Sequence, residues 1–410
     1  MQQNSKKLAL GYLAQTQALL PKVGIDDHPG GGPDLGKLTR ADVAELYAKI
    51  IDIQNTLGQS AVAKATFEKA KTLIMVGKEA HQGVVALLLK RSPSKAEAVA
   101  LFKKYATDGY LIVKLPALLE KSERDPLVKD ALRLTDAQDL SLWQRGAQYL
   151  DIARVVGLAG EKLVFEALTA MAPKLLEQGF AGPLVLCEAG VRGMEIDKAA
   201  VEKALRAAGG EAPGYVALGL LWLSKKDDAL AILAKLTDKS NVGQFPLALV
   251  DALGVDAFIA LLKRTKNSTV GYKSAVDPDF LNRESDVRLK LMQATSAMEP
   301  QAISARDWHR LLEFAYGPEI AVVHAGIRKA LRRDLPEQEK YWKQRPAPGQ
   351  GELSARQAEW KEIVVVAAQA EPALALKYLA KITEPRRKVG ALLALALAEA
   401  LKSQPKGDLG

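Results

Sequence analysis

A glycine-rich stretch near the N-terminus comes nearest to a known chemical motif. Gly31, Gly36 and Lys37 occupy the first three fixed positions of the phosphate-binding pattern G-x-x-x-x-G-K-[ST]. The next position is Leu38, where the pattern needs a hydroxyl group to hold magnesium, and Thr39 stands one residue too late. No buried strand precedes the stretch. The sequence therefore favours a loop that ends in a Thr39 helix cap over a nucleotide site.

Two groups of acidic residues contain the oxygen ligands that a divalent cation prefers. The first lies in the same loop, and its members are Asp26, Asp27, His28 and Asp34. The second lies in a polar segment, and its members are Asp277, Asp279, Glu284 and Asp286. Neither has the glycine and terminal glutamate of an EF-hand. Solvated turns, in which aspartate bonds its own backbone, explain both groups better, so we assign no metal, cofactor or catalytic residue.

The histidines form no catalytic pattern. They are His28, His81, His309 and His324, and neither H-E-x-x-H nor G-x-S-x-G occurs. His309 shares a predicted helix with Arg306, Arg310 and Glu313, which fall on one side of it. That side is either a binding patch or a solvated face, with Trp308 turned toward the core.

Basic residues are dense between Arg306 and Arg345, with Tyr341 and Trp342 among them. Such a region suits an anionic polymer, a nucleic acid or an acidic protein face, but interspersed acidic residues disfavour specific nucleic-acid binding. A smaller basic cluster begins the last helix, where cations oppose the helix dipole and are expected to turn outward. The candidate partner-binding residues are Arg306, His309, Arg310, Arg328, Arg332, Arg333, Lys343, Arg386 and Arg387.

Composition sets the class of the chain. Its 410 residues are 48% hydrophobic, 26% charged and only 6% aromatic, and the net charge is +9. This balance favours helices and a large core, and it permits anionic partners without requiring them. The single cysteine, Cys187, excludes an internal disulfide and is expected to be buried. No apolar run reaches the about 18 residues that a membrane span needs.

Helical hairpins recur along the chain. The stretch from Glu371 to Leu401 reads as a helix, a turn at Thr383-Glu384 and a second helix that begins at Pro385. Similar Thr-acid turns, each expected to cap the following helix, occur at Thr237-Asp238 and Thr107-Asp108. Apolar residues at helical spacing predict about twenty helices and no strand. Irregular spacing of the copies leaves divergent duplication and coincidental turn chemistry equally open.

The predicted fold is all-α, a helical-hairpin array of the α-solenoid or superhelix kind. It resembles tetratricopeptide- and HEAT-type arrays in architecture alone, because the Trp, Leu-Gly and Tyr signature of tetratricopeptide repeats is absent. Four segments are expected. They are an N-terminal helix and loop (1–38), a helical-repeat body (39–266), a second helical segment (267–344) and a C-terminal hairpin with a frayed tail (345–410).

The predicted function is a non-catalytic scaffold that binds a protein or peptide on an extended surface. The alternative is an enzyme or binding module acting on an anionic polymer, either a cell-wall polymer or a nucleic acid. Its cleft would be lined by the Asp26–Lys37 loop or by the 306–345 region, and convergence of the two acidic groups in one pocket would favour it. The polar start of the chain leaves two locations open, the cytoplasm or an exported compartment after removal of a leader.

Overall fold

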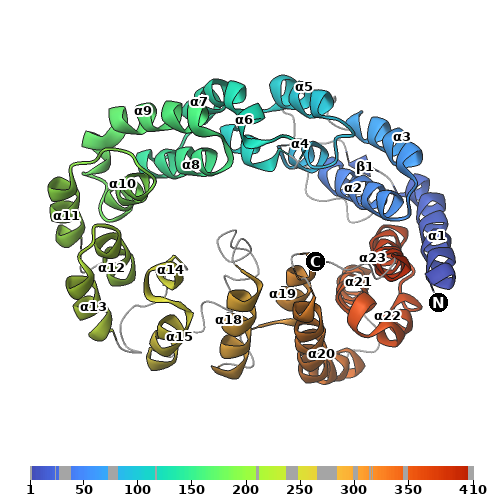
Figure 1. Cartoon of the computed structure of the whole chain (residues 1–410). Helices are drawn as coiled ribbons and strands as arrows, with labels where there is room; N and C mark the ends of the chain where they lie inside the picture. Colours follow the sequence, from blue (N-terminus) through green and yellow to red (C-terminus); the bar gives the residue numbers. More distant parts are fainter. Residues whose placement is uncertain are drawn as a thin grey trace. The chain divides into compact units, whose positions relative to one another are not determined.

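α-Helices make up nearly all the regular structure of this chain (Figure 1). The computed structural model describes residues 2–23, 25–26, 38–72, 82–115, 118–208, 212–236, 248–265, 284–298, 303–313, 315, 317–344 and 350–404. The predicted all-α class is confirmed. Within those ranges, no helix combines the length and the apolar character that crossing a membrane requires.

Contacts among the helices divide the chain into two compact units. Unit 1 combines Met1–Leu101 with Ser304–Gly410, whereas unit 2 is the continuous segment Phe102–Ile303. Unit 1 is therefore assembled from both ends of the chain. The four-segment division expected from the sequence stays a prediction.

Unit 1 takes helices from both of its segments. The N-terminal segment supplies α1 (Gln2–Leu19), η1 (Leu20–Lys22), α2 (Arg40–Thr56), α3 (Ser60–Lys71), α4 (Gln82–Leu89) and the start of α5 (Lys95–Tyr105). The C-terminal segment supplies α19 (Ala305–Arg310), η4 (Leu311–Glu313), α20 (Pro318–Gln344), α21 (Gln350–Ala370), α22 (Pro372–Leu379) and α23 (Pro385–Ser403).

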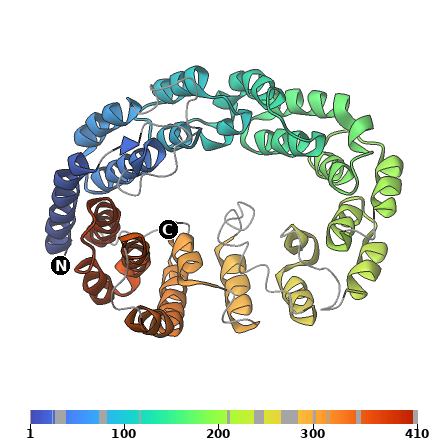
Figure 2. The ribbon, with the colours of Figure 1, turned by 180° about the vertical axis from the view of Figure 1, so that it is seen from behind.

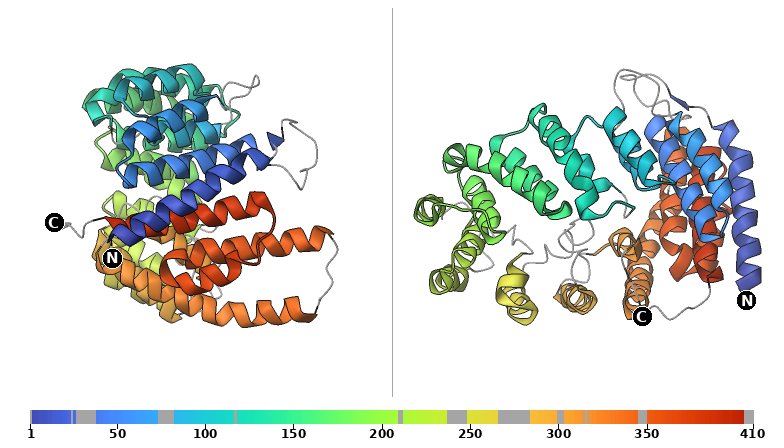
Figure 3. Two further views of the ribbon diagram at one scale, coloured as in Figure 1. Left: turned by 90° about the vertical axis from the view of Figure 1, so that its right-hand side faces the viewer. Right: turned by 45° about the horizontal axis from the view of Figure 1, so that its top comes forward.

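The core of unit 1 joins the first helix of the chain to the last. Figures 1 and 3 show α1 lying alongside α23. The buried residues of α1 are Ser5, Ala9, Leu13 and Thr16. They are three or four residues apart, so they lie on one face of the helix. Ala9 and Leu13 share a buried cluster with Ile50 of α2 and with Leu393 and Ala396 of α23. The small side chains let the two helix backbones approach closely.

A short parallel strand pair flanks the glycine-rich loop. β1 (Ile25–Asp26) pairs with β2 (Leu38–Thr39), with Ile25 opposite Leu38. The prediction of a chain without strands is therefore wrong at this place, because two-residue strands are too short to show an alternating pattern. The predicted Thr39 cap is confirmed. Its hydroxyl accepts from the backbone N–H of Asp42 at 3.1 Å, and the Asp42 carboxylate accepts from the N–H of Thr39 at 3.0 Å.

Unit 2 begins with short helices and continues with longer ones. The first part holds η2 (Gly109–Lys114), α6 (Lys121–Arg124), η3 (Asp125–Leu127) and α7 (Val128–Asp136). The second part holds α8 (Leu142–Val155), α9 (Leu158–Leu175), α10 (Ala181–Val191), α11 (Lys198–Ala207), α12 (Pro213–Trp222), α13 (Lys226–Ala234), α14 (Leu249–Leu253), α15 (Val255–Arg264) and α18 (Ser285–Met298).

Successive helices of unit 2 pack as pairs. α8 packs on α9, α10 on α11, α12 on α13 and α14 on α15. The first helices of these pairs also contact one another in chain order, α8 with α10, α10 with α12 and α12 with α14. In Figures 1 and 2, α9, α11 and α13 lie along one side of that row. The row of first helices thus forms a surface of its own within unit 2.

Apolar spacing also predicts helices at 110–121 and 318–333 and a break at 345–354, and the structure differs from each of these three predictions. The helix expected at 110–121 is a 3-10 helix that stops at Lys114, because Pro116 forces Leu115 out of helical geometry (φ −56°, ψ 133°). The helix expected to end at 333 continues to Gln344 through Pro336. Because Pro336 has no backbone N–H, the Arg332 carbonyl loses its helical hydrogen bond. Arg332 is exposed, so water can bond this carbonyl instead. The break expected at 345–354 is helical from Gln350 onward.

We predict that Leu13→Ala destabilises the protein by about 2–5 kcal/mol, because it leaves a cavity between α1 and α23. Leu13 is 4% exposed, whereas Leu8 on the same helix is 42% exposed. The matched control Leu8→Ala should cost less than about 1 kcal/mol. Urea denaturation measures both free energies of unfolding. Equal losses in the two variants would show that the α1–α23 contact contributes little.

Candidate functional site

Most of the loop residues that suggested a chemical motif lie outside the described residues. This holds for Gly31, Gly36, Lys37, Asp27, His28, Asp34, His81, Asp277 and Asp279. Glu284 and Asp286, at the start of α18, are exposed. Over the part of the chain that the structure describes, no group of three or more His, Cys, Asp or Glu side chains gathers as a metal site would require. The nucleotide and metal interpretations of the two loops stay untested.

Cys187 lies in the core of unit 2, as predicted. Its side chain is 1% exposed, and burial raises the pKa of the thiol to about 12. The thiol therefore stays protonated at neutral pH, and it behaves as a small apolar group rather than as a nucleophile.

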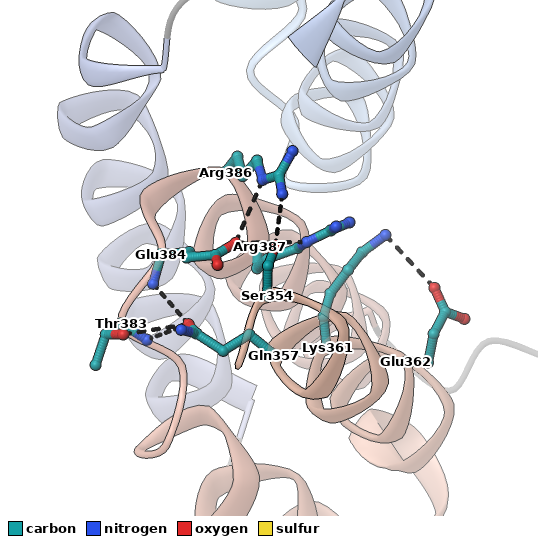
Figure 4. Close-up of polar contacts among 8 residues, drawn as sticks. All are labelled: Ser354, Gln357, Lys361, Glu362, Thr383, Glu384, Arg386 and Arg387. Carbon is teal, nitrogen blue, oxygen red and sulfur yellow. Dashed lines mark hydrogen bonds and ion pairs between the residues drawn. The ribbon is translucent and has the colours of Figure 1, made fainter. Parts of the chain in front are cut away.

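A glutamine from α21 caps the last helix (Figure 4). The Gln357 side-chain oxygen accepts from the backbone N–H of Thr383 at 2.8 Å and of Glu384 at 2.7 Å. It also accepts from the Thr383 hydroxyl at 3.2 Å. The prediction that the Thr383-Glu384 pair itself caps the helix is wrong here, because the acceptor comes from a helix distant in sequence. Pro385 does open the helix, as predicted.

The arginines at the start of α23 contact α21 and the residue that precedes α23. The Arg386 guanidinium donates to the Ser354 hydroxyl at 2.8 Å and to the Glu384 carboxylate at 3.3 Å, and its side chain is only 9% exposed (Figure 4). Arg386 therefore does not turn outward, because Glu384 at the helix N-terminus attracts it. Arg387 lies 3.7 Å from the same carboxylate, and its Nε is buried without a hydrogen-bond partner among the described groups.

A close approach explains the glycine that follows. A Cβ atom on Gly390 would lie 2.9 Å from Cε of Lys361, so the missing side chain lets the Lys361 stem cross α23. The ammonium group of Lys361 then lies 3.5 Å from the Glu362 carboxylate.

His309 is held neutral on α19. Burial disfavours the charged imidazolium, and Lys49 repels it, which together lower the pKa of His309 to about 4. Its neighbour Trp308 is 4% exposed and packs against Gly326, so the predicted inward orientation of this tryptophan is confirmed. Arg306 lies 3.9 Å from Glu362, and Arg310 is exposed.

The arginines of α20 hold this helix against the corner between α21 and α22. Arg328 donates to the Ala370 carbonyl at 3.5 Å, and Arg332 lies 3.8 Å from the Glu371 carboxylate. Arg333 pairs with its neighbour Asp334 at 2.5 Å. Arg332 is 79% exposed, so its ion pair contributes little to stability.

Lys343 joins two lysines that the sequence analysis missed. Lys377 and Lys381 lie four residues apart at the end of α22, and their ammonium groups are 5.4 and 4.4 Å from the centre of the Tyr378 ring. Partial burial, then repulsion by Lys377 and by Lys343, lowers the pKa of Lys381. We call Lys343, Lys377 and Lys381 the lysine cluster. The i, i+4 spacing was the signal that could have found two of its members.

Unit 2 contains a cavity of about 810 Å³. Its walls come chiefly from the row of first helices α8, α10, α12 and α14, and from the ends of α15 and α18. The lining residues are Arg154, Leu184, Glu188, Val191, Arg192, Tyr215, Leu218, Trp222, Ala248, Val250, Asp251, Gly254, Val255, Glu284 and Val287. Sequence reasoning missed this site, because its residues come from helices far apart along the chain.

The two arginines of the cavity wall are partly buried and have carboxylate partners. Arg154 donates to the Glu188 carboxylate from two nitrogens, at 3.1 and 2.7 Å, and the Arg192 guanidinium lies 3.5 Å from Glu161. The remaining lining is mixed: Leu184, Leu218 and Val250 are apolar, Asp251 and Glu284 are carboxylates, and Val191 is 58% exposed.

Comparison with known proteins gives no relative: no family model matches the chain, and no curated protein or solved structure matches it.

We predict that Gln357→Leu costs about 1–3 kcal/mol of stability, because it leaves two backbone N–H groups at the start of α23 without an acceptor. Gln357→Glu keeps an oxygen at the helix N-terminus and should cost less. Thermal and urea unfolding compare the two variants with the parent chain. A leucine variant as stable as the glutamate variant would contradict the cap.

We predict that His309 makes the protein less stable in acid. The unfolded imidazole binds a proton near its ordinary pKa of 6.5, whereas the folded one binds it only near 4. The contribution of neutral His309 to the free energy of unfolding is complete above pH 6.5. It is lost as the pH falls toward 4, by on the order of 2 kcal/mol. Between pH 7 and 4, His309→Gln should therefore lose less free energy of unfolding than the parent chain. Parallel pH profiles in urea unfolding would refute this.

Proposed function

We propose that this protein is a non-catalytic helical scaffold that binds a peptide or protein partner on an extended surface. We further propose that its hairpins form an array of the α-solenoid kind, similar in architecture to tetratricopeptide and HEAT repeats. The pairing of successive helices in unit 2 supports this proposal, because each pair also contacts the next pair in chain order.

The observation that carries the proposal is the position of the cavity. It is lined by the first helices of four successive pairs, whereas α9, α11 and α13 contribute no residue to its described lining. Stacked hairpins present one set of helices as a binding surface, and each helix supplies a few side chains to it. A peptide lying across this row would contact several pairs at once.

The chemistry of the cavity suits a peptide better than a polyanion. Its volume of about 810 Å³ lies in the range of small-ligand pockets, which is sufficient for a few side chains. Leu184, Leu218 and Val250 offer apolar contact. The arginines of the wall already have carboxylate partners, so a negatively charged polymer would gain little from them. Nucleic acid is disfavoured at this cavity for the same reason.

We predict that Val191→Arg weakens partner binding by about tenfold or more, because a charged side chain would enter the apolar edge of the cavity. The bait is the full chain, used to capture a stoichiometric protein from native lysate at moderate salt. The captured protein is then titrated against the parent chain and the variant. Val191 is 58% exposed, so the substitution should leave the fold intact.

The matched control is Leu158→Arg, the same kind of change at a residue that is 86% exposed and does not line the cavity. It should leave the affinity within about twofold, since surface substitutions are mostly mild. Equal losses in the two variants would reject the cavity as the binding surface. Recovery of nucleic acid alone, lost as salt rises, would reject the scaffold proposal. It would favour the alternative function, action on an anionic polymer.

A further inference from the structure

The end of α22 holds two ammonium groups in fixed positions. Lys377 lies in the last turn of α22, and Lys381 follows two residues after that helix ends at Leu379. Both lie over the Tyr378 ring, and Lys381 is also 5.7 Å from the centre of the Trp360 ring. Cation–π contacts of this kind restrict long side chains that would otherwise move freely. The two charges are therefore ordered before any partner arrives.

The aromatic residues beneath them tie α22 to α20 and α21. The Trp342 ring meets the Tyr378 ring edge-on at 6.2 Å and the Trp360 ring at 6.0 Å. The Trp342 indole N–H donates to the Glu359 carboxylate at 2.7 Å, and the Tyr378 hydroxyl donates to the Glu339 carboxylate. This frame brings Lys343, near the end of α20, close enough to Lys381 to influence its titration.

The lysine cluster is not neutralised by its surroundings. Glu339 accepts from Lys377 at 3.2 Å, and it also serves the Tyr378 hydroxyl. Lys377 and Lys381 thus share the Glu339 carboxylate, and the pair keeps a positive charge. Mutual repulsion of Lys343, Lys377 and Lys381 is an unfavourable energy that a bound anion would relieve. By contrast, Arg332 and Arg333 nearby on α20 already have acidic partners.

We propose that the lysine cluster is a docking site for an acidic peptide segment of a protein partner. The three lysines lie at or just after the ends of two helices, whereas a nucleic acid needs a basic track along several phosphates. Leu376, next to Lys377, is 46% exposed and offers an apolar contact that a peptide can use. This site lies in unit 1 and does not depend on the cavity of unit 2.

The test measures binding of a short fluorescein-labelled peptide of Glu and Leu by fluorescence anisotropy. The triple variant Lys343→Gln, Lys377→Gln, Lys381→Gln should bind about tenfold more weakly than the parent chain, since three exposed ion pairs are lost. The matched control Lys6→Gln, Lys7→Gln, Lys22→Gln removes the same charge from exposed positions on α1 and η1. It should change the affinity by less than about twofold.

Several outcomes would overturn the proposal. The first is that the parent chain does not bind the acidic peptide, and the second is that both triple variants weaken its binding equally. The third is that a single-stranded oligonucleotide binds the parent chain more tightly than the peptide does, and that the triple variant of the lysine cluster loses this binding too. Thermal unfolding checks that the triple variant is folded. If it is not, the peptide titration is repeated with the single variant Lys377→Gln, because the Lys377 side chain is 55% exposed. Val191→Arg must bind the acidic peptide normally. This comparison separates failure of the lysine cluster from failure of the cavity.

Discussion

Unit 1 depends on the packing of α1 against α23. Ala9 and Leu13 of α1 share one buried cluster with Leu393 and Ala396 of α23. These residues are separated by nearly the whole chain, so the contact must offset the entropy of closing a very long loop. That entropy grows only slowly with loop length, and a buried apolar stripe is sufficient to offset it.

The corner between α22 and α23 shows how charge is used in this fold. Gln357 supplies the acceptor that the start of α23 needs, and Arg386 is held between Ser354 and Glu384. A basic cluster at a helix N-terminus would oppose the dipole, but here the carboxylate of Glu384 lies between the dipole and the guanidinium. Arg386, a candidate partner-binding residue in the sequence, therefore stabilises the turn between α22 and α23.

The two proposed binding surfaces differ in their charge balance. In unit 2, Arg154 and Arg192 of the cavity wall have carboxylate partners, and apolar residues lie beside the carboxylates Asp251 and Glu284 in the lining. In unit 1, the lysine cluster retains uncompensated charge above a rigid aromatic frame. Each unit thus carries one surface of distinct chemistry, and a partner of mixed character would find complementary features on each of them.

The sequence alone determined the helical class, the burial of Cys187 and the Thr39 cap, because periodicity, composition and caps act over a few residues. It also located Pro385 at the start of the last helix. Only the tertiary structure decided that Gln357 caps that helix, that Lys343 meets Lys381, and that four helices of unit 2 line a cavity. The physical reason is that periodicity shows which face of a helix is apolar, but not which distant helix covers it.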